Sequence, residues 1–134
     1  MATGTLGTQA RDYPSRAERF CFPLTLASIA SGASVKAGTI PAGSGMMRCT
    51  TVVGTAFNAG TLNNISVGNV SGGAQIVAAV AIGAVGINNL TIIAAQAGPL
   101  AADTPIWLTG NFTGAAPTAG NALFVLEWSN PLAA

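Results

Sequence analysis

The chain has 134 residues, enough for one domain with a sizeable core and too few for two. Only 7% of the residues are charged, against about 25% in ordinary globular domains, while half are hydrophobic. The net charge of +1, without a basic cluster after residue 19, argues against nucleic-acid binding. The lack of histidine excludes most catalytic triads and metal sites.

Residues 1–19 are predicted to form an extended N-terminal arm. They carry five of the nine charged residues and show no hydrophobic periodicity. Such a segment is disordered by itself or becomes ordered against a neighbouring chain. Since Tyr and Arg are enriched among residues that dominate binding energy, the arm contains suitable anchors, and two Phe residues join it to the body. The expected interaction residues are Arg11, Tyr13, Arg16, Arg19, Phe20 and Phe22.

Strand patterns begin at Phe20. In residues 20–27 apolar side chains alternate with the others at a period of two. Pro23 has no N–H for a hydrogen-bond ladder, so we expect this strand at a sheet edge. Residues 34–40 form a second short strand. It ends in a turn in which Pro41 fixes φ and Gly43 allows a positive φ.

Residues 46–57 form a third strand and residues 61–67 a fourth. In the third strand the pattern places Met47, Cys49, Thr51 and Val53 on one face, and Met46, Arg48, Thr50 and Val52 on the other. The strands are separated by Asn58-Ala59-Gly60. Because Asn and Gly tolerate positive φ, we expect a hairpin with a three-residue loop.

The second half of the chain contains the most apolar run, residues 76–87. At twelve residues it is shorter than the roughly 20 that a membrane helix needs, so it is predicted to be core. Residues 75–84 fit either an Ala-rich helix or a buried strand, and residues 88–95 fit a strand. Residues 104–112 and 118–128 are the expected final strand pair.

The last strand is apolar on both faces. Alternation puts four apolar residues on one side, Ala122, Phe124, Leu126 and Trp128. The other side holds Leu123, Val125 and Glu127. We therefore expect one face to be core and the other to meet a partner.

These seven or eight short strands, with turns every eight to twelve residues, predict an all-β sandwich. The expected organisation is an arm over residues 1–19 and a single β-sandwich domain over residues 20–134. Cys21 and Cys49, without histidine, cannot complete a tetrahedral zinc site in one chain. Because nothing in the sequence indicates export, free buried thiols are expected rather than a disulfide, although pairing stays open.

Two alternatives rest on individual side chains. Asp103 and Glu127 are the only carboxylate pair of the body and would be needed for a glycosidase, but they are interpreted as a turn residue and an outer-face residue. Trp107 and Trp128 would stack on sugar rings if the chain were a tail or fibre domain that binds a cell-surface glycan. Core or interface positions are the preferred interpretation, and we expect no catalytic residue, metal or cofactor.

Three stretches carry a resemblance to a known family: AGTIPAGSGMMRCTTVVGTAFNAGTLNNISVG, ADTPIWLTG and TAGNALFVLEW. Over residues 37–128 the chain resembles small virion proteins of tailed bacteriophages, in particular the head decoration, or cement, proteins. The resemblance implies a jelly-roll or related β-sandwich on the outer capsid surface, clamping neighbouring capsomers without catalysis.

The resemblance also implies partners and a location. The major capsid protein would be a separate chain, and copies of this protein would form a homo-oligomer, either a dimer or a trimer. The protein would be made in the host bacterial cytoplasm. The low net charge and the short apolar run separately predict no nucleic-acid or membrane partner. A nearly uncharged body agrees with this expectation, since coverage by other chains explains how it stays soluble.

Overall fold

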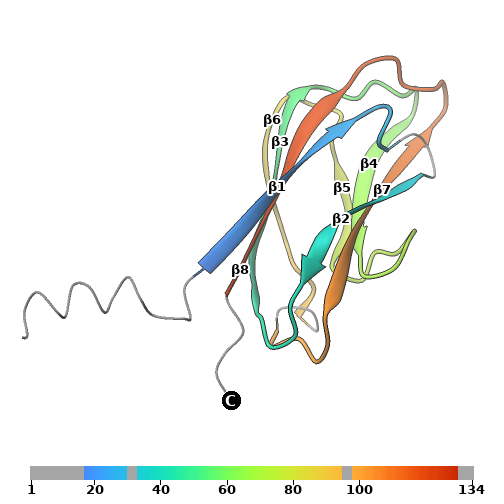
Figure 1. Cartoon of the computed structure of the whole chain (residues 1–134). Coiled ribbons are helices and arrows are strands. Elements are labelled where there is room, and N and C mark those ends of the chain that lie inside the picture. Colours follow the sequence, from blue (N-terminus) through green and yellow to red (C-terminus); the bar gives the residue numbers. More distant parts are fainter. Residues whose placement is uncertain (1–16, 30–32, 95–97, 130–134) are drawn as a thin grey trace, which may run out of the picture.

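A computed structural model describes residues 17–29, 33–94 and 98–129, and these residues form eight β-strands (Figure 1). The strands make two four-stranded antiparallel sheets that face each other as a sandwich. Their bounds are β1 Ala17–Thr25, β2 Ser34–Ile40, β3 Met46–Thr55, β4 Leu62–Gly68, β5 Val77–Ala81, β6 Gly86–Leu90, β7 Thr104–Thr113 and β8 Asn121–Ser129. The predicted all-β sandwich is confirmed.

The strand order is that of a jelly roll. Sheet A has the order β1-β8-β3-β6 and sheet B the order β2-β7-β4-β5. Consecutive strands therefore change sheets at every step except β4 to β5, which pair directly. Eight strands wound between two sheets in this way make the double-sheet jelly roll.

The core lies between the sheets and takes one face of every strand. Alternate residues of β8 point inward, and Phe124 and Leu126 are fully buried. From sheet B, Ile106 and Leu108 of β7 meet them in the same cluster. Strand β1 lies at an edge of sheet A, as Pro23 predicted, and β2 has the predicted bounds. Gly43 has the positive φ, 85°, that the predicted turn requires.

The predicted hairpin at residues 58–60 is wrong. Strand β3 belongs to sheet A and β4 to sheet B, so the intervening residues cross from one sheet to the other. Phe57 explains the difference, because its side chain is only 1% exposed and its ring stacks on that of Phe112 at 5.6 Å. Burial of this ring stabilises the crossing by about 2 kcal/mol relative to leaving it in water.

Side-chain oxygens, rather than the backbone hydrogen bonds of a hairpin, satisfy backbone N–H groups around this crossing. The Asn58 side-chain oxygen accepts hydrogen bonds from the backbone N–H groups of Thr118 and Ala119. The Asn63 oxygen accepts one from the N–H of Ala59, at 2.6 Å. The Asn residues that suggested a tight turn thus satisfy loop backbone groups.

Three further expectations are resolved. Residues 75–84 contain a strand, β5, and not a helix. Strands β7 and β8 are not a pair, because they lie in opposite sheets.

The third expectation, simple alternation over residues 46–53, is wrong at its start. A bulge between Met46 and Arg48 interrupts the alternation, so that Met46 is buried and Met47 is 59% exposed.

Candidate interaction surface

The outer face of sheet A carries side chains from all four of its strands. Register places most of these residues in three rows that run across the sheet, and a polar row of Thr25, Asn121 and Thr55 lies beyond them. The apolar row is Pro23, Leu123, Val52 and Ile87. The middle row is Cys21, Val125, Thr50 and Asn89. The charged row is Arg19, Glu127 and Arg48.

The apolar row is open to solvent. Val52 and Leu123, on the two central strands, are 38% and 37% exposed, and Ile87 on the edge strand β6 is 69% exposed. Single exposed apolar residues are normal on protein surfaces, but a contiguous row across four strands is typical of an interaction surface. The predicted second apolar face of β8 is therefore present and is continued by its neighbours.

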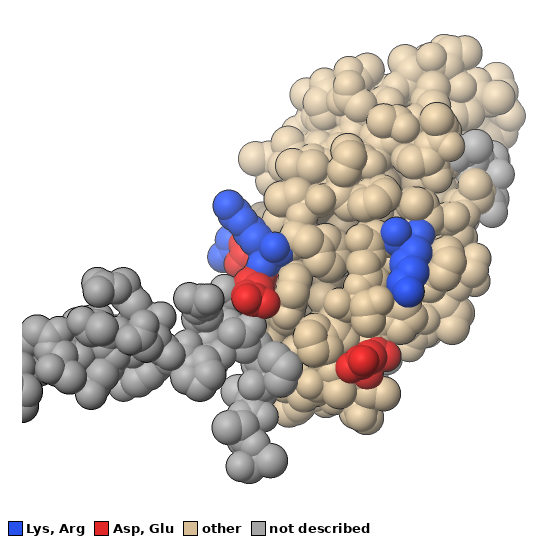
Figure 2. All heavy atoms as spheres, in the orientation of Figure 1, with Lys and Arg blue, Asp and Glu red and all other residues tan. Residues whose placement is uncertain are grey.

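The charged row lies at the other end of the same face. Glu127 of β8 stands between Arg19 of β1 and Arg48 of β3 in register. Figure 2 shows basic and acidic side chains gathered in the region of β1 and β8, while most of the remaining visible surface has no charge. The middle row between the two ends is half polar, and the Thr50 hydroxyl donates to Asn89 Oδ1 at 3.4 Å.

The outer face of sheet B differs, because the chain covers it with its own residues. Ser34 and Thr109 share a hydroxyl hydrogen bond of 2.8 Å, and the backbone N–H of Gly72 donates to Ser34 Oγ at 2.9 Å. Ser66 donates to the carbonyl of Gly73 from β4. The loop between β4 and β5 therefore lies over this sheet and leaves Ser66 and Thr109 each 5% exposed. Of the two outer faces, sheet A is the candidate interaction surface.

The structure separates the predicted interaction residues. Arg19 is exposed in the charged row. Phe20 and Phe22 point to the inner side of β1 and are half-buried against the core, with the Phe20 ring 5.5 Å from that of Trp128. Their contacts are thus internal to the sandwich. The remaining predicted residues, Arg11, Tyr13 and Arg16, lie outside the described residues.

Sequence reasoning missed Pro23 and Ile87 as members of the surface. The signal for Val52 was available, because the pattern of residues 46–53 placed it opposite Cys49 and Val53, which are buried. Pro23 was interpreted only as an edge marker. Ile87 was assigned to an apolar core run, whereas its place on the edge strand β6 leaves it exposed.

The two carboxylates of the body do not share a cleft. Asp103 precedes β7 of sheet B, and its Oδ1 accepts a 2.9 Å hydrogen bond from the N–H of Ala42. Glu127 lies on the outer face of sheet A. The turn and outer-face interpretations of these two residues therefore fit the structure better than a catalytic pair.

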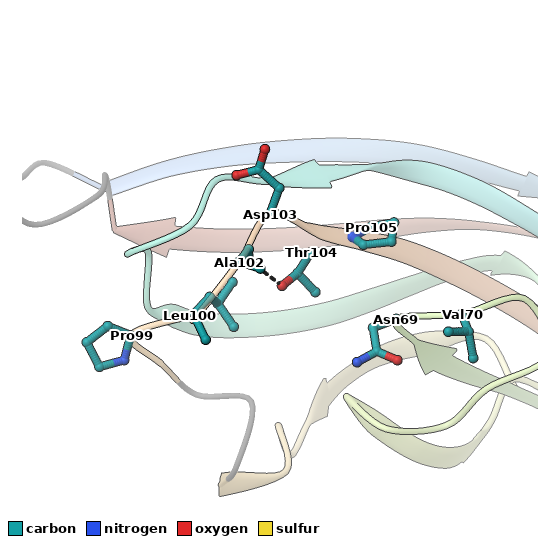
Figure 3. Close-up of a pocket in the computed structure, with 9 residues that line it drawn as sticks. Asn69, Val70, Pro99, Leu100, Ala102, Asp103, Thr104 and Pro105 are labelled. Atoms are coloured by element: carbon teal, nitrogen blue, oxygen red, sulfur yellow. Dashed lines mark hydrogen bonds between the residues drawn. The ribbon is translucent and has the colours of Figure 1, made fainter.

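A shallow pocket beside Asp103 offers little chemistry. It is lined by Asn69, Val70 and the segment from Pro99 to Pro105. In Figure 3 the carboxylate of Asp103 points away from Asn69 and Val70, and the Thr104 hydroxyl donates to the carbonyl of Ala102. Within the part of the chain that the structure describes, no three His, Cys, Asp or Glu residues are grouped to hold a metal ion.

The tryptophans do not form a stacking platform for sugar. Trp128 is 9% exposed and packs in the core against Phe20. Trp107 is half-buried on the outer side of sheet B, where its register partners are Lys36 and Gly68. Because they lie on different faces of different sheets, the two rings cannot bind one sugar chain together.

The cysteines also lie on opposite faces of sheet A. Cys49 is buried on the inner side of β3, and burial raises the pKa of its thiol to about 12. Cys21 is exposed in the middle row, so the prediction of buried thiols is right for Cys49 and wrong for Cys21. Both are free thiols.

Reaction with a thiol reagent is expected to distinguish the two cysteines. In dilute native protein at neutral pH, one thiol per chain should be labelled rapidly by a maleimide, because only Cys21 is accessible and Cys49 stays protonated. Mass spectrometry of the intact chain would measure this. The Cys21→Ser variant should remain unlabelled until denaturant is added, whereas rapid labelling of that variant would contradict the buried position of Cys49.

Within residues 17–29, 33–94 and 98–129 there is no helix with the length and hydropathy needed to cross a bilayer. The sequence matches no protein-family model and no curated protein.

Two solved structures are similar to the chain. One is a chain from the capsid of Ralstonia phage GP4, with a TM-score of 0.67 and 20% identity over 91% of this chain and 89% of that chain. The other is a chain from the cyanophage Pam1 capsid asymmetric unit, with a TM-score of 0.64 and 12% identity over 89% of this chain and 88% of that chain. Nearly the whole chain therefore has the fold of chains found in phage capsids.

Proposed function

We propose that the chain is a bacteriophage virion protein that binds the outer surface of the head and clamps neighbouring capsomers, as a decoration protein does. The observation that carries this proposal is the jelly roll shared, over about nine-tenths of both chains, with a chain from the capsid of Ralstonia phage GP4. The short motifs of residues 37–128, which resemble head decoration proteins, point to the same role.

The outer face of sheet A supports a binding role. Its apolar row provides apolar surface that a partner can bury. Its charged row provides charges that fix the position of a partner with complementary charges. Multiple copies on a shell hold it together through many contacts, each of which is weak alone. The proposed role is structural and not enzymatic, which the capsid chains of similar fold support.

The N-terminal arm is the proposed contact with the head, whereas the outer face of sheet A remains available to a further copy of this protein. The arm predicted over residues 1–19 overlaps β1, which begins at Ala17 and holds Arg19 in register with Glu127. We therefore assign residues 1–16 to the arm, with Arg11, Tyr13 and Arg16 as anchors, and residues 17–134 to the body. The position of β1 supports this, because the chain enters the sandwich on an edge strand of sheet A, next to the exposed face. An extended segment at that edge can bind a neighbouring chain by main-chain hydrogen bonds.

The proposed partners are the major capsid protein, as a separate chain, and further copies of this protein. The location is the outer surface of the virion, reached after synthesis in the host cytoplasm.

Co-sedimentation with phage heads that lack this protein tests the proposal. The full chain should pellet with heads, and the triple variant Arg11→Ala, Tyr13→Ala, Arg16→Ala should bind at least about tenfold more weakly because its arm anchors are removed. Lys36→Ala, on the outer side of sheet B, is a control for loss of positive charge and should bind as the unmodified chain does.

Two results would reject the proposed function. One is failure of the unmodified, folded chain to bind heads at any concentration tested. The other is binding to glycans of a cell surface without binding to heads, which would favour a tail or fibre domain.

A further inference from the structure

We infer that the outer face of sheet A binds a second copy of this chain across a two-fold axis that runs parallel to the strands, between β3 and β8. The inference rests on the proposed function, because it specifies the homo-oligomer that this function includes. Its basis is the order of the apolar, middle and charged rows on that face.

The symmetry fixes which strands meet. A two-fold axis along the strands reverses the order of the strands and keeps each row level with its counterpart. Strand β3 of one copy then faces β8 of the other, and β6 faces β1. The sheets lie about 10 Å apart, as sheets do when they pack face to face. The central strands lie nearest the axis, so sheet twist displaces their contacts least.

The charges of the two faces match under this operation. Glu127 of each copy lies opposite Arg48 of the second copy, so the interface contains two equivalent Glu–Arg pairs. Within one chain, Glu127 has a cationic neighbour in register on each side, and the row has an excess of positive charge. The second copy adds one carboxylate and two guanidinium groups, so the two facing rows together hold four arginines and two glutamates, and the central contacts place each Glu127 opposite an Arg48.

The apolar residues match as well. Leu123 of one copy lies opposite Val52 of the second, and Pro23 lies opposite Ile87. In the middle row, Val125 faces Thr50 of the second copy. Apolar residues thus meet apolar residues at one end of the face, while opposite charges meet at the other end.

Other two-fold axes fit the face less well. An axis across the strands would place the charged row against the apolar row and leave Glu127 desolvated without a new partner. An axis between β1 and β8 would also pair Arg19 with Glu127, but it would leave β6 and the exposed Ile87 outside the contact. The central, strand-parallel axis is the one that covers all four strands and pairs opposite charges.

Charge-reversal variants test this contact in solution, using the full chain. In a dimer of Arg48→Glu chains, position 48 of one copy and Glu127 of the other are both acidic at each contact. In a dimer of Glu127→Arg chains, position 127 of one copy and Arg48 of the other are both basic. Analytical ultracentrifugation should show the unmodified protein at twice the chain mass of 13.2 kDa. Each variant alone should dimerise at least tenfold more weakly. An equimolar mixture of the two variants should recover the dimer, because a dimer of one chain of each kind again places a glutamate opposite an arginine at both contacts.

Lys36→Glu is the matched control, because it makes the same charge reversal on the outer side of sheet B. It should leave the dimer unchanged, and circular dichroism should show that all variants are folded. A monomeric or trimeric unmodified protein would overturn the inference. So would folded variants that dimerise alone, or a mixture that stays monomeric.

The experiment separates this inference from the proposed function. It requires no phage heads, so a monomer that nevertheless pellets with heads would overturn the dimer alone. A dimer with the expected charge behaviour that does not bind heads would support the contact and reject the head-binding role.

Discussion

Replacing Phe57 with alanine is expected to lower the free energy of unfolding by about 3–5 kcal/mol, the range typical of fully buried aromatic residues. The Phe57 side chain is 1% exposed and lies where the chain crosses from sheet A to sheet B. Its ring stacks on Phe112 of β7, with planes 18° apart, so its loss removes the contact of the crossing segment with sheet B as well as apolar burial. Urea denaturation followed by fluorescence would measure the change.

Val70→Ala is the matched control for this variant. Val70 is 52% exposed in the loop after β4, so its truncation should change the free energy of unfolding by less than about 0.5 kcal/mol. A Phe57→Ala protein as stable as this control would show that Phe57 does not pack between the sheets.

Phe57 also shows why local signals did not predict the topology. Asn58-Ala59-Gly60 between two strand patterns is a standard hairpin signal, but the same residues also suit a link between two sheets. The choice depends on whether Phe57 finds a buried position, and its partner Phe112 is 55 positions later in the chain. Gly120 approaches the same ring, and a Cβ at that glycine would overlap Phe57. None of these contacts is visible in a short window of sequence.

Strand positions were more predictable than strand partners. The last strand showed its two faces directly, because large apolar residues alternate with others, and Phe124 and Leu126 are indeed buried. Residues 75–84 gave no such contrast, since Ala78, Ala79 and Ala81 of β5 are exposed although they count as apolar. A pattern made mostly of alanine has too little contrast in size and hydropathy to separate helix from strand.

Only part of the candidate surface was predictable, because the sequence pattern indicated strand positions but not which strands are neighbours. Leu123 and Val125 suggested that the outer side of β8 meets a partner. The apolar row, however, combines residues 23, 52, 87 and 123, which come from four strands and meet only through the jelly-roll order of sheet A. Burial of Phe20 and Phe22 was likewise a consequence of pairing with β8, where Phe22 lies in register with Phe124.

High pH is expected to destabilise the protein through Cys49. The thiol has a pKa of about 12 in the folded chain, against 9.0 for an unperturbed thiol, because burial disfavours the thiolate. Between these two values the unfolded chain has lost the proton and the folded chain keeps it. The free energy of unfolding therefore falls as pH rises above 9.0, and this contribution reaches about 2 kcal/mol near pH 10.5.

The Cys49→Ala variant isolates this effect. Its free energy of unfolding should be lower than that of the unmodified chain near pH 7, because a small cavity replaces the sulfur, but it should decline less between about pH 8 and about pH 10.5. Urea denaturation at a series of pH values measures both curves, with Cys21→Ser introduced into both proteins so that only one thiol differs. Parallel curves across this range would mean that the Cys49 thiol titrates in the folded chain as it does in the unfolded one, and would contradict its burial inside sheet A.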